Sequence, residues 1–233
     1  MDRNSNSYIF IYSIIMVVVV ALALSFVATT LKPKQEKNIA VEKKRNILSA
    51  IHIESSADNA ELLFDKYITK MLVVDVQGNP VNGIDAFTID LKTELHKQDA
   101  ERHLPVYIAK IDDGSTKYIF PLYGKGLWGP IWGYIAVNDD MNSVYGTVFA
   151  HKGETPGLGA EIETKEFQKQ FDGKTLFNSD SVFVSILVLK DGQTGAEEHS
   201  VDAISGGTIT SKGLELMLSD CLKQYMNFFT KNK

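Results

Sequence analysis

Ser205-Gly206-Gly207-Thr208-Ile209-Thr210 joins a pair of glycines to two hydroxyl residues at alternate positions, directly before a long apolar pattern. The apolar residues recur at steps of three and four, which is typical of an amphipathic helix. They are Leu214, Met217, Leu218, Cys221, Leu222, Tyr225, Phe228 and Phe229. We therefore predict a turn that leads into a helix N-terminus, where unpaired N–H groups and the helix dipole favour an anion such as a phosphate.

The same stretch also has a simpler interpretation. Ser and Thr are common N-cap residues and Gly-Gly is a common turn, so Ser205–Thr210 could do no more than start the last helix. The two interpretations differ in whether other parts of the chain supply a binding surface beside the turn.

The composition is that of a folded protein. Of the 233 residues, 44% are apolar and 23% are charged, enough for one large or two small domains. The net charge of −5, with one short basic cluster at 43–45, does not predict a nucleic-acid surface. The single cysteine, Cys221, excludes an internal disulfide and a cysteine-based zinc or iron–sulfur site within this chain, and its place on the apolar stripe predicts a buried thiol.

The segment from Tyr8 to Leu31 contains no charged residue and is dominated by Ile, Val, Leu, Ala and Phe. At about 1.5 Å per residue it reaches roughly 36 Å, enough to cross a hydrocarbon core of about 30 Å. We predict an N-terminal tail over 1–7 and a transmembrane helix over 8–31. A cleaved signal peptide is the alternative, but its apolar core would span only about 7–15 residues, and no small-residue cleavage site follows this run.

The charges beside this span favour a cytoplasmic C-terminal domain. Arg3 precedes the span, whereas six basic residues follow it: Lys32, Lys34, Lys37, Lys43, Lys44 and Arg45. The positive-inside rule weakens when a long domain follows, so the charges alone leave the orientation open.

The remaining chain predicts an α+β domain. Helical spacing predicts helices over 38–51 and 55–69, the second capped by Ser55 or Ser56. Before the last helix, the sequence also predicts a helix over 164–171 and a strand over 181–190. Runs of β-branched and aromatic residues separated by turn residues predict strands over 71–76, 105–110, 117–122, 131–137 and 143–150, most of them in antiparallel hairpins. Residues 82–104 carry no firm assignment.

We therefore expect a single N-terminal transmembrane helix followed by a mixed antiparallel-sheet domain with flanking helices. Residues 32–104 are predicted to form juxtamembrane helices and an α+β segment that packs on a domain over 105–233.

Gly124, Gly126 and Gly129 match the spacing of a dinucleotide-binding fingerprint, but the context excludes that fold. The fingerprint must open a helix, whereas here Pro130 leads into a predicted strand. The segment instead places both tryptophans, Trp128 and Trp132, among small residues, where they could face a planar ring or merely close the end of a sheet.

His151–Gly159 contains three glycines and a proline between a predicted strand and a predicted helix. Such a loop allows backbone N–H groups to approach a ligand closely, although it could also be a plain connection. The histidines of the chain are scattered and no Gly-x-Ser-x-Gly elbow is present, so neither a metal centre nor a hydrolase is indicated.

Three stretches in combination resemble a known family: Gly124–Tyr134, Glu154–Gly159 and Ser205–Thr210. Together they are similar to the FMN-binding domain shared by two bacterial respiratory complexes. These are the sodium-translocating NADH:quinone reductase, through its C subunit, and the Rnf electron-transport complex, through its G subunit. The N-terminal span, Arg45–Leu48 and Leu104–Tyr107 extend the resemblance towards the reductase C subunit over nearly the whole chain.

The resemblance implies a covalent cofactor. In the family the pattern Ser-Gly-Ala-Thr-x-Thr carries FMN through a phosphoester on its last threonine, which corresponds to Thr210 here. Gly207 stands where the family has alanine, and a smaller residue should not block the turn. A separate magnesium-dependent flavin transferase makes the link from FAD, so this chain need not catalyse its own modification.

The resemblance also assigns the residues around FMN. The turn contributes Thr210 as the attachment residue together with Ser205, Gly206, Gly207, Thr208 and Ile209, and the surroundings of the ring are Leu127, Trp128, Glu154, Thr155 and Leu158. Lys190 and Asp202 are candidates for polar contacts near the ring or the phosphate. No general acid, general base or metal ligand is assigned.

As a member of this family, the chain would relay electrons one at a time between redox centres of neighbouring subunits, on the way from NADH to quinone, while the complex exports sodium. The implied partners are the other subunits of an inner-membrane complex, the flavin transferase and membrane lipid. The implied topology has a cytoplasmic N-terminus and a flavin domain on the outer, periplasmic face, against the local charges. The alternatives are the G subunit of the Rnf complex and a membrane-tethered binding module without a redox role.

Overall fold

The computed structural model describes residues 5–190 and 192–233. It divides into two compact units, Met1–Lys43 and Lys44–Lys233, which are treated separately below. Of the N-terminal tail predicted over 1–7, residues 1–4, including Arg3, lie outside the described residues.

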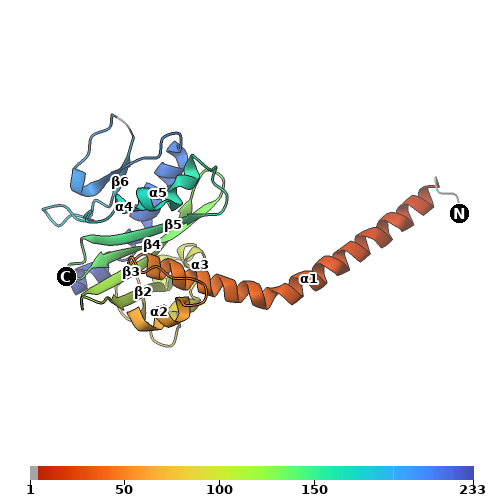
Figure 1. The fold of residues 1–233 in the computed structure, drawn as a ribbon, viewed down its shortest axis with the longest axis horizontal. Coiled ribbons are helices and arrows are strands. Elements are labelled where there is room, and N and C mark those ends of the chain that lie inside the picture. Colours follow the sequence, from red (N-terminus) through yellow and green to blue (C-terminus); the bar gives the residue numbers. More distant parts are fainter. Residues whose placement is uncertain (1–4, 191) are drawn as a thin grey trace. The chain divides into compact units, whose positions relative to one another are not determined.

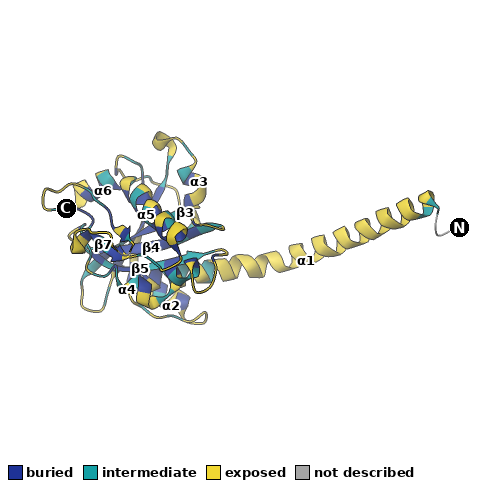
Figure 2. Ribbon diagram, turned by 90° about the horizontal axis from the view of Figure 1, so that it is seen from above, coloured by how far each residue is buried: buried dark blue, intermediate teal, exposed yellow. Residues whose placement is uncertain are grey.

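Helix α1, Asn6–Ser49, contains the predicted transmembrane segment. It is long and apolar enough to cross a membrane, and none of its most apolar 18-residue window is buried. In Figure 2 this part of α1 is drawn almost entirely in the exposed colour. Because uninterrupted exposed apolar surface is costly in water, this helix fits a hydrocarbon environment.

The separate helix predicted over 38–51 is wrong, because α1 continues without a break to Ser49. Residues 34–45 are mostly Lys, Glu, Gln and Ala, which favour a helix and contain no glycine to end it. Pro33, the one residue in the helix that cannot donate a backbone hydrogen bond, is accommodated within α1.

The main sheet of the second unit has five strands in the order β1-β2-β3-β4-β5, and every neighbouring pair is antiparallel (Figure 1). The strands are β1 Ile68–Val74, β2 Leu104–Lys110, β3 Thr116–Lys125, β4 Pro130–Asn138 and β5 Val144–His151. A second, parallel sheet joins β6, Leu187–Leu189, to β7, Ser200–Asp202. The predicted α+β class and the hairpins after Leu104 are confirmed.

Short helices fill the connections. They are α2 Ala60–Tyr67, α3 Leu91–Leu95, α4 Lys165–Lys169, α5 Thr208–Lys223 and α6 Met226–Asn232, with 3-10 turns η1 Ala86–Thr88, η2 Asp99–Glu101, η3 Gly159–Glu163 and η4 Glu197–His199. Residues 82–104, which the sequence left unassigned, thus contain η1, α3 and η2.

Two sequence-based predictions differ from these elements. Helix α2 begins at Ala60 rather than near Ser55, because the Asn59 side chain accepts a hydrogen bond from Ser56 N (2.7 Å) and closes a turn before the helix. The strand predicted over 181–190 is only three residues long, since Ser181 and Ser185 have φ values of 58° and 62°, which an extended strand does not permit.

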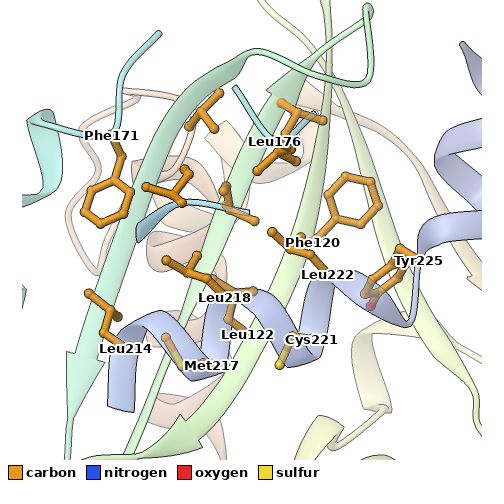
Figure 3. Packing of buried hydrophobic residues seen from close by; sticks show 14 of the residues in the cluster. Phe120, Leu122, Phe171, Leu176, Leu214, Met217, Leu218, Cys221, Leu222 and Tyr225 are labelled. Atoms are coloured by element: carbon orange, nitrogen blue, oxygen red, sulfur yellow. The ribbon is translucent and has the colours of Figure 1, made fainter. Parts of the chain in front are cut away.

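The sheet is buried on both faces. Alternate residues of each strand point to opposite sides, so Phe120 and Ile119 belong to different apolar clusters. One face packs against α5 and α6, and Figure 3 shows Phe120 and Tyr225 among the side chains between this face and α5. The Phe120 ring centroid lies 4.8 Å from that of Tyr225 and 4.9 Å from that of Phe229. The other face packs against α2 and residues 47–51, which include the end of α1 and the two residues after it.

Helix α5 approaches β3 very closely, and two glycines permit it. A Cβ atom on Gly213 would lie 2.2 Å from the Lys125 carbonyl oxygen, and one on Gly124 would lie 2.6 Å from Met217 Cβ. This packing fixes the position of the N-terminal turn of α5, which carries the candidate site.

Candidate functional site

The three stretches singled out in the sequence meet at one carboxylate, that of Glu154. Its Oε2 accepts a 2.5 Å hydrogen bond from Thr210 Oγ1, in the first turn of α5. Its Oε1 accepts a 2.9 Å hydrogen bond from Trp128 N, in the turn between β3 and β4. Glu154 itself follows β5, so one side chain links three connections that are far apart in the sequence.

Glycines allow this close approach. The β3–β4 turn is closed by a hydrogen bond from Gly126 N to Gly129 O (2.8 Å). A Cβ on Gly126 would lie 2.6 Å from Glu154 Oε1, and one on Gly159 would lie 2.4 Å from Thr210 Oγ1 and 2.7 Å from Glu154 Oε2. Any larger residue at either position would displace the hydrogen-bonded pair.

Glu154 is a buried carboxylate, with only 4% of its surface exposed. Burial by itself raises its pKa, but the hydrogen bond from Thr210 and those from the backbone N–H groups of Trp128, Leu127 and Gly129 lower the pKa below the usual range of a glutamate. The site therefore holds an ionised carboxylate against a buried hydroxyl.

Neither Ser205 nor Thr208 acts as the N-cap of α5. The N-cap position is Gly207, which makes no side-chain cap hydrogen bond, and both hydroxyl residues are exposed. Instead, Ser211 Oγ accepts a hydrogen bond from Ile204 N (3.2 Å), which ties the turn to the helix. The prediction that a Ser or Thr side chain of this turn caps the helix is therefore wrong, and the start of α5 keeps N–H groups that can meet an anion.

Four large apolar side chains of the same stretches are exposed: Leu127, Trp128, Leu158 and Ile209. Trp128 is 70% exposed. Leu158 covers the turn, since a Cβ on Gly206 would lie 2.6 Å from Leu158 Cδ2, and Gly206 has a φ of 72° that favours glycine. Clustered exposed apolar side chains are typical of a binding surface, and here they could face a planar ring.

Three predicted site residues remain: Thr155, Lys190 and Asp202. Thr155 is exposed, and its carbonyl accepts hydrogen bonds from Leu158 N and Ala160 N (3.1 Å each). Lys190 follows β6, and Asp202 ends β7, three residues before Ser205; both are exposed. Within the described residues, neither the Lys190 nor the Asp202 side chain hydrogen-bonds to Glu154 or Thr210, so the structure does not join them to the pair.

Sequence reasoning missed the residues that shape the pair rather than contact a ligand. Ser211 belongs to none of the three stretches, and Gly159 was part of the Glu154–Gly159 stretch without being assigned this role, because both roles depend on tertiary contacts. A cavity of about 350 Å³ elsewhere in the second unit is lined by Ser49, His52, Ile53, Glu54, Thr147, Lys165, Gln168, Lys169 and Asp172, and shares no residue with the candidate site. The candidate site is an open surface around a buried hydrogen bond.

Known proteins resemble this chain over most of its length. The C subunit of the Na+-translocating NADH-quinone reductase of Vibrio alginolyticus is 34% identical over 210 residues, covering 82% of this chain and 80% of that protein. The chain belongs to the family of these C subunits. The Pasteurella multocida C subunit is 36% identical over 80% of this chain and 78% of its own. These relatives are subunits of an oxidoreductase complex, and the preference for the reductase C subunit is confirmed.

The solved structures and the domain family agree with this assignment. The crystal structure of the Parabacteroides distasonis C subunit is 42% identical, with a TM-score of 0.80, and covers 86% of this chain and 97% of that one. The family described as FMN-binding domain matches residues 126–223, a range that includes Trp128, Glu154 and Thr210. This C-subunit homologue is thus a membrane-anchored FMN-binding protein, as α1 and the family together indicate.

Proposed function

We propose that this chain is the flavoprotein subunit of an Na+-translocating NADH-quinone reductase, and that it carries FMN through a phosphoester on Thr210. The observation that carries the proposal is the bridge made by Glu154, whose carboxylate contacts Thr210 and Trp128 at once. That bridge brings a hydroxyl, a helix N-terminus and exposed apolar side chains to one surface. A phosphorylated planar ring needs these three features together.

The residues at this surface fit FMN. The N–H groups at the start of α5, from Thr208 onwards, suit the phosphate, whereas Leu127, Trp128 and Leu158 suit the ring. When bound, FMN supplies redox chemistry. We assign binding and orientation to the chain: Thr210 would tether the group and Thr155 would line the ring, whereas Lys190 and Asp202 are proposed for polar contacts near the ring or the phosphate.

A tether on Thr210 would serve electron relay within a larger complex. A covalent link retains the redox group in every oxidation state, so the chain does not depend on rebinding it. We place the other subunits of the complex, a flavin transferase and membrane lipid among its partners, and sodium export is a property of the whole complex. The family resemblance favours the outer face for the flavin, and the flanking lysines do not oppose this strongly, because long domains are translocated largely regardless of charge.

Thr208 and Thr210 provide a matched pair for the test. Full-length chain is co-expressed with a flavin transferase, and the band at 25.9 kDa is viewed under ultraviolet light on a denaturing gel. Wild type and Thr208→Val should fluoresce, whereas Thr210→Val should be dark. A dark wild-type band would refute covalent attachment, and a fluorescent Thr210→Val with a dark Thr208→Val would move the link to Thr208.

A reporter fusion tests the topology. Fusing an enzyme that is active only outside the cytoplasm to the C-terminus, after Lys233, should give active reporter if the flavin domain lies on the outer face. Activity of a cytoplasm-specific reporter at the same position would refute this orientation.

A further inference from the structure

We infer that Glu154 is the general base that accepts the Thr210 proton when this threonine is esterified with the flavin phosphate. The inference rests on the proposed function, because it takes Thr210 as the attachment residue. It assigns a chemical role to a side chain for which the sequence indicated only a place near the ring.

The hydrogen bond has the direction that base catalysis requires. An ionised carboxylate can only accept, so the Thr210 hydroxyl must be the donor. The distance of 2.5 Å is at the short end of the range for an O–H···O⁻ hydrogen bond. With its proton directed at Glu154, the Thr210 oxygen has its lone pairs free for attack on phosphorus.

The carboxylate is held in place without help from the segment that covers Thr210. Glu154 Oε1 is anchored by Trp128 N, and Glu154 N donates to His151 Nδ1 (3.1 Å). Gly159 lies close to the Thr210 hydroxyl, since a Cβ on it would lie 2.4 Å from Thr210 Oγ1, and Thr210 is only 1% exposed. Attachment requires residues 155–159 to move aside for the flavin donor, and the contacts of Glu154 with Trp128 and His151 do not depend on those residues.

The reaction balances with a flavin adenine dinucleotide as the donor, presented by a separate transferase. Thr210 Oγ1 forms a bond to the phosphorus of the flavin half, and the pyrophosphate P–O bond breaks. The electron pair of that bond leaves with adenosine monophosphate, and the hydroxyl proton passes to Glu154 Oε2. No atom changes oxidation state. Carboxylates that accept a proton from an attacking hydroxyl are established in phosphoryl transfer.

This transfer also removes an electrostatic conflict. Attachment places a phosphodiester anion where the Thr210 proton had been, within reach of the Glu154 carboxylate. Two anions so close in a buried site would repel each other strongly. A protonated Glu154 is neutral and can donate a hydrogen bond to the new phosphate oxygen instead.

The test compares Glu154→Gln with Glu163→Gln in the full-length chain. Glu163 also accepts a backbone hydrogen bond in this region, from His151 N (2.9 Å), but it does not touch Thr210. The rate of flavin attachment is measured with purified transferase and FAD, by in-gel fluorescence and intact mass. Glu154→Gln should be slower by about 10²- to 10⁴-fold, the range of general base catalysis, whereas Glu163→Gln should match wild type.

Chemical rescue separates a base from a positioning residue. Added formate should restore part of the rate in Glu154→Ala, because a small carboxylate can enter the space left by the side chain, and added chloride should not. Unfolding midpoints of all variants identify any loss that comes from misfolding; if Glu154→Ala fails to fold, Glu154→Gln alone decides.

Each outcome supports or overturns one statement. A wild-type rate in a folded Glu154→Gln overturns the base assignment, and so does a slow Glu154→Gln whose alanine counterpart folds but does not respond to formate. Both leave the proposed function intact as long as Thr210→Val stays unlabelled. An unlabelled wild type overturns the proposed function itself.

Discussion

Replacing Gly159 with alanine would place a methyl group inside the Glu154–Thr210 hydrogen bond. The added carbon would lie 2.4 Å from Thr210 Oγ1, 2.7 Å from Glu154 Oε2 and 3.0 Å from Thr210 Cβ. The two oxygens cannot simply turn away, since each is buried and hydrogen-bonded, and Thr210 Cβ is fixed to the backbone of α5. The hydrogen bond must break or the loop must move.

The cost follows from this geometry. Overpacking a well-filled site typically costs about 1–3 kcal/mol of the free energy of unfolding. In a domain of this size each kcal/mol lowers the melting temperature by about 2–4 °C, so Gly159→Ala should lower it by about 2–12 °C. Thermal unfolding of the full-length chain in detergent, followed by near-ultraviolet circular dichroism, measures the change.

Gly153 provides the matched control in the same loop. A Cβ on Gly153 would meet no atom within 4 Å, and its φ is not in the left-handed region. Alanine there restricts the unfolded chain without strain, so Gly153→Ala should leave stability unchanged or raise it by up to about 1 kcal/mol. A Gly159→Ala melting temperature equal to or above that of Gly153→Ala would refute the reasoning.

Three further predictions concern the rest of the domain. Gly213→Ala should lower the free energy of unfolding by about 1–3 kcal/mol despite the higher helix propensity of alanine, because the methyl would lie 2.2 Å from the backbone oxygen of Lys125. A urea midpoint equal to or above that of wild type would contradict the close α5–β3 contact. Burial raises the pKa of Glu94, but hydrogen bonds from Lys97 and His103 N lower it below the usual value. A carboxyl whose pKa is lower in the folded state stabilises the fold at pH values above its unfolded pKa of about 4.3, and this stabilisation is lost as the pH falls through the folded-state pKa. The difference in free energy of unfolding between wild type and Glu94→Gln should therefore shrink below about pH 4.3, and a difference that stays constant with pH would contradict this role of Glu94. Burial raises the pKa of the Cys221 thiol to about 12, so a thiol reagent at pH 8 should label the chain only after unfolding, and rapid labelling of the folded chain would show the thiol to be accessible.

The sequence predicts what depends on local pattern. The uncharged run over 8–31 and the strands after Leu104 follow from composition and alternation, and the structure contains both. The strand over 181–190 fails because apolar residues alone cannot reveal the left-handed Ser181 and Ser185. The helix predicted over 38–51 fails as a separate element because nothing between it and the span ends a helix.

In the candidate site too, the sequence predicted individual residues but not the contacts between them. Motifs identified Glu154 and Thr210 separately, but the hydrogen bond between them joins residues 56 positions apart and depends on how α5 packs on β3. The burial of Thr210 could not be predicted from the sequence either, since a residue in the first turn of a helix can face either the sheet or solvent. Periodicity predicted which face of α5 is buried only from Leu214 onwards.

Under the proposed function, burial bears directly on which hydroxyl of the turn would receive the flavin phosphate. Thr208 is exposed, so accessibility alone would favour it over Thr210, which is buried. A hydrated hydroxyl has no fixed base, however, whereas the Thr210 hydroxyl is held against an ionised carboxylate in a site that excludes water. If a base in fixed geometry decides, a Thr208→Val, Thr210→Ser double variant should still be labelled, because serine retains the hydroxyl beside Glu154. If exposure decides, that variant should be dark, since it lacks the exposed hydroxyl, and Thr210→Val should fluoresce.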